Sequence, residues 1–262
     1  MSVELSVIIP AYNSEYTIEK CINSVINECE NNNLEYEILV IDDGSKDNTA
    51  EIVKNLIKKN KNIKLFYQEN SGPSEARNNG LRNASGKYIA LNDSDDEWFE
   101  GKLKLQLDIL KNNENIDLLS GQFGNVKSKK EKLIKVTFRK EAFHNYFATS
   151  TIIFKNTIKN KFFPINMKYS EDMRFFITVM EDFNCYIVKK VLVKNIFSKR
   201  NWGDSGLSSK LKEMEYGELS NLKYMYKKHL ISLGIFCLAV PYSYAKYIRR
   251  FIYTKINRNK DK

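Results

Sequence analysis

Cysteine and histidine are scarce in this chain of 262 residues, which holds four Cys and two His. The cysteines lie far apart and none has the CxxC spacing of a zinc site: Cys21, Cys29, Cys185 and Cys237. This argues against a zinc-binding module or a disulfide framework and fits a reducing cytosol. Proline and glycine form no rich linker, and the sequence has no internal repeat.

Long hydrophobic runs are also lacking. The run LISLGIFCLAV covers only residues 230–240, whereas a helix that spans a bilayer needs about 20 apolar residues. Extending the run to Ile248 takes in Pro241 and Lys246. The first residues, MSVELSVIIPAYN, have no basic region followed by an apolar core, so we expect no signal peptide.

Positive charge is unevenly distributed. Residues 1–100 hold 10 Lys and Arg against 18 Asp and Glu, a net charge of −8, and residues 101–262 hold 32 against 14, a net charge of +18. A solvated surface explains part of the excess. A basic half beside an acidic half also suggests that the second half meets an anionic partner.

The first hundred residues alternate between β-branched runs and amphipathic segments. We expect strands over residues 5–10, 36–43, 62–68 and 86–91, and helices over residues 14–30, 47–60 and 73–84, the first capped by Ser14. This order predicts a parallel sheet with helices on both faces. Because ligands bind beyond the carboxyl ends of such strands, the polar segments that follow the strands should converge on one edge.

The second half is harder to interpret. We expect helices over residues 101–113 and 171–182, strands over 116–124, 150–155 and 185–199, and a helical extension over 210–262 after a domain of residues 1–209. In the extension, aromatic residues alternate with Lys and Arg beyond residue 241, which favours a helix lying on an anionic bilayer. Packing onto the domain, a single membrane span and contact with nucleic acid are the alternatives.

Two acids, Asp93 and Asp95, directly follow the strand at 86–91. Carboxylates two residues apart can present oxygens to one Mg²⁺ or Mn²⁺ ion, which takes its other ligands from substrate phosphates. A DxD pair alone is more often structural, for example in capping a helix. Its position at the end of a buried strand favours a metal site.

A second acidic pair, Asp42 and Asp43, ends the strand at 36–43. The segment IDDGSKDNT is not a phosphate-binding P-loop, but its carboxylates can accept hydrogen bonds from a base or ribose. An ordinary turn with a helix cap at Asp47 is the alternative. Tyr12 offers a ring for stacking, although a lone Tyr often only packs, and Arg77 could pair with a phosphate.

Four segments in natural order resemble the family 2 glycosyltransferases with a GT-A fold, in which a Rossmann-like, mostly parallel sheet is flanked by helices. They are SVIIPAYNSEYTIEKCINSV, ILVIDDGSKDNT, NSGPSEARNNGLRNASGKYIALNDSDDEW and EDMRF. The similarity is nearly continuous over residues 5–100 and falls to short islands beyond them. Asn92 departs from the family pattern, which usually has an apolar residue there.

The resemblance implies a role for each matching residue. Asp172 is the expected general base, Asp95 the direct metal ligand with Asp93 beside it, and SKRNWGDSGLS (198–208) the loop that closes over the diphosphate. The expected nucleotide-sugar contacts are Pro10, Tyr12, Asp42, Asp43, Arg77, Asp93, Ser94, Arg200, Trp202 and Ser208. His144 and Glu171 are weaker candidates for the acceptor side, because a lone histidine is often structural and Glu171 could be a helix-start charge.

These roles predict an inverting transfer from a nucleoside-diphosphate sugar, most simply a UDP-sugar, with Mn²⁺ or Mg²⁺ as cofactor. The expected acceptor is a glycan or lipid-linked oligosaccharide of bacterial surface polysaccharide or lipo-oligosaccharide synthesis, and the expected location is the cytoplasmic face of the membrane. The alternatives are a metal-dependent nucleotidyltransferase, a non-catalytic relative, and a basic nucleic-acid-binding protein. The acidic strand-end edge argues against nucleic acid as a partner.

Overall fold

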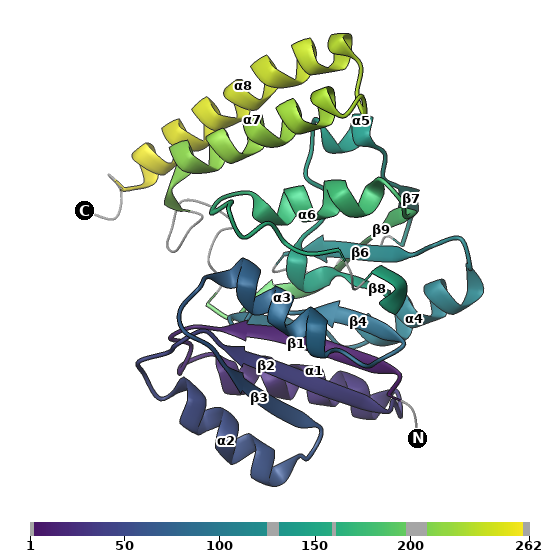
Figure 1. The fold of residues 1–262 in the computed structure, drawn as a ribbon, viewed down its shortest axis with the longest axis vertical. Coiled ribbons are helices and arrows are strands. Elements are labelled where there is room, and N and C mark those ends of the chain that lie inside the picture. The colour runs from purple at the N-terminus through teal and green to yellow at the C-terminus, as the bar shows by residue number, and fades with distance from the viewer. Residues whose placement is uncertain (1–2, 125–130, 159–160, 198–208, 259–262) are drawn as a thin grey trace.

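A computed structural model describes residues 3–124, 131–158, 161–197 and 209–258 of the protein (Figure 1). The elements of residues 5–91 alternate as expected, and a short strand that was not predicted follows directly over residues 96–98. In chain order the elements up to residue 112 are β1 (Leu5–Ala11), α1 (Ile18–Asn31), β2 (Tyr36–Asp42), α2 (Thr49–Lys59), β3 (Ile63–Tyr67), α3 (Pro73–Asn83), β4 (Tyr88–Leu91), β5 (Asp96–Trp98) and α4 (Lys102–Asn112).

The second half adds further strands and the C-terminal helices. Its elements are β6 (Leu118–Phe123), β7 (Leu133–Lys135), α5 (Phe138–Glu141), η1 (Thr149–Thr151), β8 (Ile153–Lys155), η2 (Asn156–Ile158), α6 (Glu171–Met180), β9 (Cys185–Asn195), α7 (Leu211–Lys227) and α8 (Leu233–Arg258). The helical extension predicted after residue 209 therefore forms as α7 and α8. In the part of the chain that the structure describes, no helix is long and apolar enough to cross a membrane.

All described strands join one sheet in the order β3-β2-β1-β4-β8-β6-β9-β5, with β7 paired to β9. β3, β2, β1 and β4 are parallel, as the alternating first half predicted. In the second half β8 is antiparallel to both neighbours, and β5 and β7 are antiparallel to β9. The predicted α/β fold class is confirmed, and these antiparallel pairs are a feature that the sequence did not reveal.

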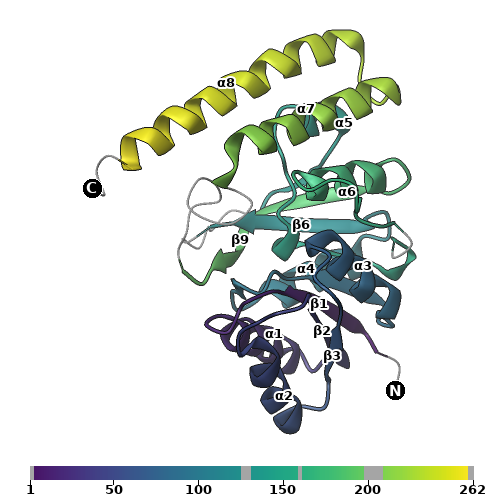
Figure 2. The same ribbon diagram turned by 60° about the vertical axis from the view of Figure 1, so that its left-hand side comes forward.

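Side chains alternate across the sheet, as the two-residue period of a strand requires. In β1, Val7 and Ile9 pack on the face covered by α1, α2 and α4, whereas Ile8 packs on the face covered by α3 and α6. A third cluster joins α6 to α7 and α8 through residues such as Met173, Leu222 and Ala239. Both views place α7 and α8 outside α6, on the side away from α2 (Figures 1 and 2).

The first helix begins later than predicted. Ser14 is not its cap, because α1 starts at Ile18 after a turn in which the Ser14 carbonyl accepts hydrogen bonds from the N–H groups of Thr17 and Ile18. The Ser14 hydroxyl lies 2.7 Å from the hydroxyl of Ser94 instead. Ser14 thus connects the end of β1 to the acidic turn after β4.

Candidate active site

The carboxyl ends of β1, β2 and β4 meet at one edge of the sheet, as the parallel register requires. Tyr12 follows β1 and exposes 47% of its surface, so its ring is open to a ligand. Pro10 is buried within β1 and opposes Ile41 of β2. The prediction that Pro10 contacts a nucleotide therefore depends on its backbone rather than on an exposed ring.

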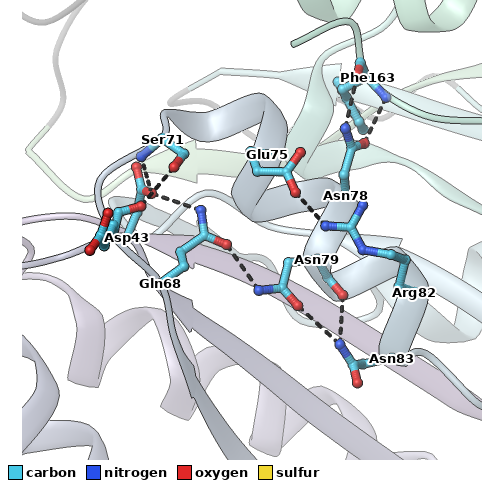
Figure 3. Close-up of polar contacts among 10 residues, drawn as sticks. Asp43, Gln68, Ser71, Glu75, Asn78, Asn79, Arg82, Asn83 and Phe163 are labelled. Atoms are coloured by element: carbon cyan, nitrogen blue, oxygen red, sulfur yellow. Dashed lines mark hydrogen bonds and ion pairs between the residues drawn. The ribbon is translucent and has the colours of Figure 1, made fainter.

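Asp43 organises the loop between β3 and α3 (Figure 3). Its Oδ1 accepts hydrogen bonds from Gln68 Nε2 and the Ser71 N–H, and its Oδ2 accepts one from the Gly72 N–H, each at 2.8 Å. Gln68 in turn accepts a hydrogen bond from Asn79 of α3. Most of the Asp43 carboxylate is thus occupied within the protein, so its predicted contact with a base would use the remaining oxygen lone pair.

Asp42 has a local role of the same kind. Its Oδ1 accepts a hydrogen bond of 2.9 Å from the Ser45 N–H, which closes the turn after β2. The turn contains Gly44 at a φ of +75°, a value that favours glycine. The alternative of an ordinary turn therefore describes the geometry of Asp42 in this structure, and its contact with a nucleotide stays a prediction.

The acidic turn after β4 is held by two neighbours, Ser150 and Asn195. The Asp93 N–H donates a hydrogen bond of 2.9 Å to Ser150 Oγ, and Asp95 Oδ2 accepts one of 3.0 Å from Asn195 Nδ2. Asp96 is buried at the start of β5 and accepts a hydrogen bond from Ser150 Oγ. Burial, followed by the charges of Asp93 and Asp95, raises the pKa of Asp96 to about 8.

The cation among these acids is Arg77. Its guanidinium is buried, lies 2.7 Å from Asp93 Oδ1 and 3.4 Å from Glu171 Oε1, and stands over the ring of Phe163. Burial alone would lower the pKa of Arg77, but the two carboxylates raise it overall, so the side chain stays charged. Without a ligand, Arg77 is the counter-ion of the turn. Its predicted contact with a diphosphate or base stays untested.

Asp172 and Glu171 lie together at the start of α6, directly across from Asp93 and Arg77. Glu171 pairs with Arg77, while Asp172 Oδ1 accepts a hydrogen bond of 2.7 Å from the Met173 N–H. Burial raises the pKa of Asp172, and burial together with the charge of Asp172 raises that of Glu171. A carboxylate with a raised pKa is a stronger proton acceptor, which is what a general base requires.

These groups share one cleft of about 900 Å³. Arg77, Asp93 and Asp96 line one part of it, Glu171 and Asp172 another, and His144 lies on its wall. Burial and the nearby charges of Lys246 and Lys189 lower the pKa of His144, which keeps its imidazole neutral at pH 7. The structure therefore brings the predicted base, Asp93 of the DxD pair and the weak acceptor candidate His144 to a common space, whereas Asp95 does not line the cleft.

Several residues of the cleft have no signal in the sequence that drew attention to them. They are Glu141, Ser150, Lys189 and Lys246. Asn195 does not line the cleft but holds the acidic turn beside it. Glu141 lies three residues after Phe138, the spacing of neighbours on one helix face, which could have indicated a buried carboxyl. Ser150 and Asn195 are identified only by their hydrogen bonds to the acidic turn in the folded structure. The predicted residues Arg200, Trp202 and Ser208 lie outside the described residues.

The protein's own oxygen atoms could hold a divalent cation only if a bound substrate supplied further metal ligands. Over residues 3–124, 131–158, 161–197 and 209–258, no group of three or more His, Cys, Asp or Glu side chains is arranged to hold a metal ion. Asp93 and Asp95 nevertheless present carboxylate oxygens on one turn. Because Mg²⁺ and Mn²⁺ commonly combine one or two carboxylates with substrate phosphates, the residues present fit such an ion.

Comparison with known sequences identifies a family. The family described as Glycosyl transferase family 2 has a sequence model that matches residues 6–176 of this chain. A glycosyltransferase of Escherichia coli, "UDP-Glc:alpha-D-GlcNAc-diphosphoundecaprenol beta-1,3-glucosyltransferase WfgD", is 34% identical over 219 residues, which cover 80% of this chain and 82% of WfgD. A "GalNAc(5)-diNAcBac-PP-undecaprenol beta-1,3-glucosyltransferase" of Campylobacter jejuni is 41% identical over 102 residues, covering 38% of this chain and 32% of the relative.

An uncharacterized glycosyltransferase of Rickettsia bellii is 46% identical over 111 residues, which cover 42% of this chain. The chain spans 15% to 18% of the length of the Rickettsia relatives that it matches.

Two solved structures share the fold. Staphylococcus aureus TarS 1-349 in complex with UDP-GlcNAc superposes with a TM-score of 0.63 at 23% identity, covering 87% of this chain and 69% of TarS. The mannosyltransferase PcManGT of Pyrobaculum calidifontis, in complex with GDP-Man and Mn2+, superposes with a TM-score of 0.67 at 17% identity, covering 94% and 74%. At these identities the two structures confirm the GT-A fold alone.

Proposed function

Because this chain belongs to glycosyl transferase family 2, we propose that it transfers a hexose or N-acetylhexosamine from a UDP-sugar to a hydroxyl of a lipid-linked glycan acceptor. The reaction would serve bacterial surface polysaccharide or lipo-oligosaccharide synthesis. WfgD supports the choice of donor and acceptor, since its name specifies UDP-Glc and a diphosphoundecaprenol-linked sugar and it aligns over most of both chains.

The observation that carries the proposal is the position of Asp172. Its carboxylate has a raised pKa and lines the same cleft as Asp93 and Arg77, which adjoin the strand ends where a nucleotide would bind. A donor at the strand ends would therefore have its anomeric carbon between the acidic turn and Asp172. This is the arrangement that a single displacement needs.

In that displacement Asp172 takes the proton of the acceptor hydroxyl while the hydroxyl oxygen attacks the anomeric carbon. The bond from that carbon to the diphosphate oxygen breaks, and UDP leaves with the electron pair. Attack from the face opposite to the leaving group inverts the anomeric centre, so an α-linked donor gives a β-glycoside. Arg77 keeps Glu171 and Asp93 in place around the reacting atoms.

Asp95 and Asp93 are the residues that would hold Mn²⁺ or Mg²⁺. When bound, such an ion would offset the negative charge of the diphosphate. Tyr12 would stack on the base, while Asp42, Asp43 and Ser94 shape the loops around it. The predicted closing loop with Arg200, Trp202 and Ser208 belongs to the same proposal, although those residues lie outside the described part of the chain.

The outer face of α8 supports the proposed membrane contact. Several large apolar side chains of this helix are about half exposed: Leu238, Tyr244, Ile248, Phe251, Ile252 and Ile256. Exposed apolar side chains gathered on one helix favour an interaction site, and Arg249 and Lys255 on the same helix suit anionic lipid headgroups. We propose that the protein acts while bound to the cytoplasmic face of the bacterial membrane.

A donor screen tests the function. UDP-Glc, UDP-Gal, UDP-GlcNAc and UDP-GalNAc would be titrated by thermal shift, with and without Mn²⁺, followed by an assay of UDP release with a lipid-linked acceptor. We expect one UDP-sugar to raise the melting temperature and to release UDP only when acceptor is present. Release of pyrophosphate from a nucleoside triphosphate, with no response to any UDP-sugar, would refute the proposal.

A further inference from the structure

The wall of the cleft nearest to the C-terminal helices has a composition of its own. It is formed by α5 and the residues after it, by β9 and by α8. Of these, α5 and α8 lie beyond α6 as seen from α3, whereas β9 belongs to the sheet (Figures 1 and 2). We call it the cationic wall and define it by Glu141, His144, Lys189, Lys246 and Arg249. The displacement proposed above uses none of these residues.

Positive charge on this wall exceeds what its own acids neutralise. Lys246 lies 3.3 Å from Glu218 Oε2, so it is paired. Lys189 and Arg249 are exposed and have no ion-pair partner among the described residues. Lys246 and Lys189 both lie close enough to His144 to depress its protonation. Lys189 of β9 and Arg249 of α8 thus bring an unneutralised positive field to one side of the cleft, which is the condition for binding an anion.

Glu141 provides a second and independent observation. It is only 1% exposed, and one of its oxygens accepts a hydrogen bond of 3.2 Å from the Tyr146 N–H. Its other oxygen, Oε1, is buried and has no hydrogen-bond partner in the part of the chain that the structure describes. A buried polar atom without a partner is costly, so a group that arrives with a ligand is the natural partner for it.

The charges around Glu141 locate it within the cleft. Burial, together with the neighbouring charge of Asp172, raises the pKa of Glu141 to about 8, against the opposing effects of the Tyr146 N–H and Lys246. Glu141 therefore lies between the proposed base and the cationic wall's lysines. At neutral pH it carries a proton, so its carboxyl can donate a hydrogen bond to an oxygen of a ligand.

We propose that the cationic wall binds the diphosphate of a lipid-linked sugar acceptor, with Lys189 and Arg249 pairing with phosphate oxygens and Glu141 hydrogen-bonding to the acceptor beside Asp172. This inference rests on the proposed function and narrows its acceptor. Planar guanidinium and ammonium groups both pair with phosphate through charge-assisted hydrogen bonds. The carboxyl of Glu141, being neutral, does not repel the anion.

The position of the wall limits the length of the glycan. A hydroxyl at Asp172 and a diphosphate at the wall occupy the same cleft, so few sugar rings can lie between them. The lipid would then leave along α8, whose outer face carries Ile248 and Ile252. The favoured acceptor is therefore a diphospholipid carrying one or a few sugars rather than a long oligosaccharide.

Two soluble probes that differ only in the diphosphate show how much this group contributes to acceptor binding. One is decyl-diphosphate α-N-acetylglucosamine and the other is decyl α-N-acetylglucosaminide, which has the same sugar and chain without the diphosphate. Each is titrated calorimetrically into the full-length protein without donor. We expect the wild-type protein to bind the diphosphate probe on the order of tenfold more tightly, since one charge-assisted hydrogen bond supplies that factor.

A charge-reversed variant and a neighbouring control locate the effect. Lys189→Glu should abolish the preference for the diphosphate probe, and Lys189→Ala should reduce it; both variants change an exposed side chain and should fold. Lys190→Glu is the matched control, because Lys190 is next in β9 but pairs with Glu131 and does not line the cleft. It should keep the wild-type preference.

Equal binding of both probes by the wild-type protein would overturn the inference, and so would a Lys189→Glu variant that keeps the preference. A loss of preference in the Lys190→Glu control would also overturn it, because the effect would then be one of general charge. Since neither titration contains a donor, these outcomes are independent of the UDP-sugar screen, which alone decides the proposed function.

Discussion

Single residues explain how the acidic turn is tolerated without a ligand. Asp93 pairs with Arg77, Asp95 with Asn195, and Glu97 with Lys20 and Lys194. Burial raises the pKa of Asp96, so this side chain is largely protonated at neutral pH. The repulsion that the sequence suggests for residues 93–97 is therefore reduced in three ways: cations pair with Asp93 and Glu97, Asp95 accepts a hydrogen bond, and Asp96 holds a proton.

Removing the counter-ion should destabilise the protein. Arg77→Ala leaves Asp93 and Glu171 without their shared cation, and breaking such a buried pair costs about 3 to 5 kcal/mol. Arg77→Lys should recover part of the loss, because an ammonium keeps the charge but cannot span both carboxylates. Urea unfolding would measure both.

The matched control for this change is Arg82→Ala on the same helix. Arg82 pairs with Glu75 at an exposed site, so its loss should cost less than about 1 kcal/mol. Unfolding free energies that fall equally in Arg77→Ala and Arg82→Ala would show that Arg77 does not neutralise the turn.

The protonation of Glu141 should appear as a pH dependence of stability. Its folded pKa of about 8 is above its ordinary value of 4.5, so between these values the folded state holds a proton that the unfolded state releases. The contribution of Glu141 to the free energy of unfolding is therefore greatest at low pH and is lost as the pH rises towards 8. Glu141→Gln removes the effect.

We therefore expect Glu141→Gln to gain stability over the wild-type protein between about pH 5 and about pH 9, by roughly 4 kcal/mol. Thermal or urea unfolding at both pH values would measure the difference. Parallel stability profiles for the two proteins would mean that Glu141 is charged in the folded state.

At the scale of elements, α7 fixes the turn from which α6 begins. The backbone of Ser170 is left-handed, with a φ of 55°, and its carbonyl accepts a hydrogen bond of 2.9 Å from Asn221 Nδ2. A Cβ added to Gly217 would lie 2.5 Å from the Tyr169 carbonyl oxygen. Asn221 and Gly217 thus hold in place the turn that precedes Asp172.

Gly217→Ala should displace that turn and with it the proposed base. Displacing the carboxylate of Asp172 in this way is expected to lower kcat by about tenfold or more while leaving the donor affinity nearly unchanged. Gly234→Ala on α8 is the control, since its added Cβ would meet only Ser232 Oγ at 4.0 Å. Steady-state kinetics on both variants would measure the effect, and unchanged kcat in Gly217→Ala would contradict the role of α7.

The elements differ in how far the sequence could predict them. The parallel half was predictable because each strand and helix of residues 5–91 has a clear hydrophobic period and a polar turn after it. β8 is only three residues long and follows the short helix η1, so residues 150–155 read as one strand. The pairing of Arg77 with Glu171 joins residues 94 positions apart, a contact that local patterns do not encode.

For the whole molecule, the C-terminal helices complete the cleft and present an apolar face outwards. Met214 and Glu218 of α7 and Lys246 and Arg250 of α8 line the cleft, while Ile248 of α8 is exposed. The aromatic and basic pattern beyond residue 241 pointed to a surface helix. Its contribution to the cleft was not predictable, because it depends on how α8 packs against α7.

Replacing the outer apolar residues should release the protein from membranes. Ile248→Glu combined with Ile252→Glu removes two buried side chains from a bilayer contact, worth about 1.5 to 3 kcal/mol each, and adds negative charge. Binding to anionic vesicles in a flotation assay should fall more than tenfold. Ile165→Glu, at an exposed position before α6, is the control and should bind like the wild-type protein.

Vesicle binding that is unchanged in the double variant would contradict the membrane role of α8. It would leave the cleft and its chemistry unaffected, because neither Ile248 nor Ile252 lines it.

The central claim is that Asp172 removes the acceptor proton, and one comparison tests it most directly. Donor affinity and UDP release with acceptor would be measured on the same preparation of Asp172→Asn, with Asp182→Asn, in the turn that follows α6, as control. We predict that Asp172→Asn binds the UDP-sugar as tightly as the wild-type protein but transfers at least about 100-fold more slowly, and that the control does both normally. Transfer by Asp172→Asn at the wild-type rate would contradict the account.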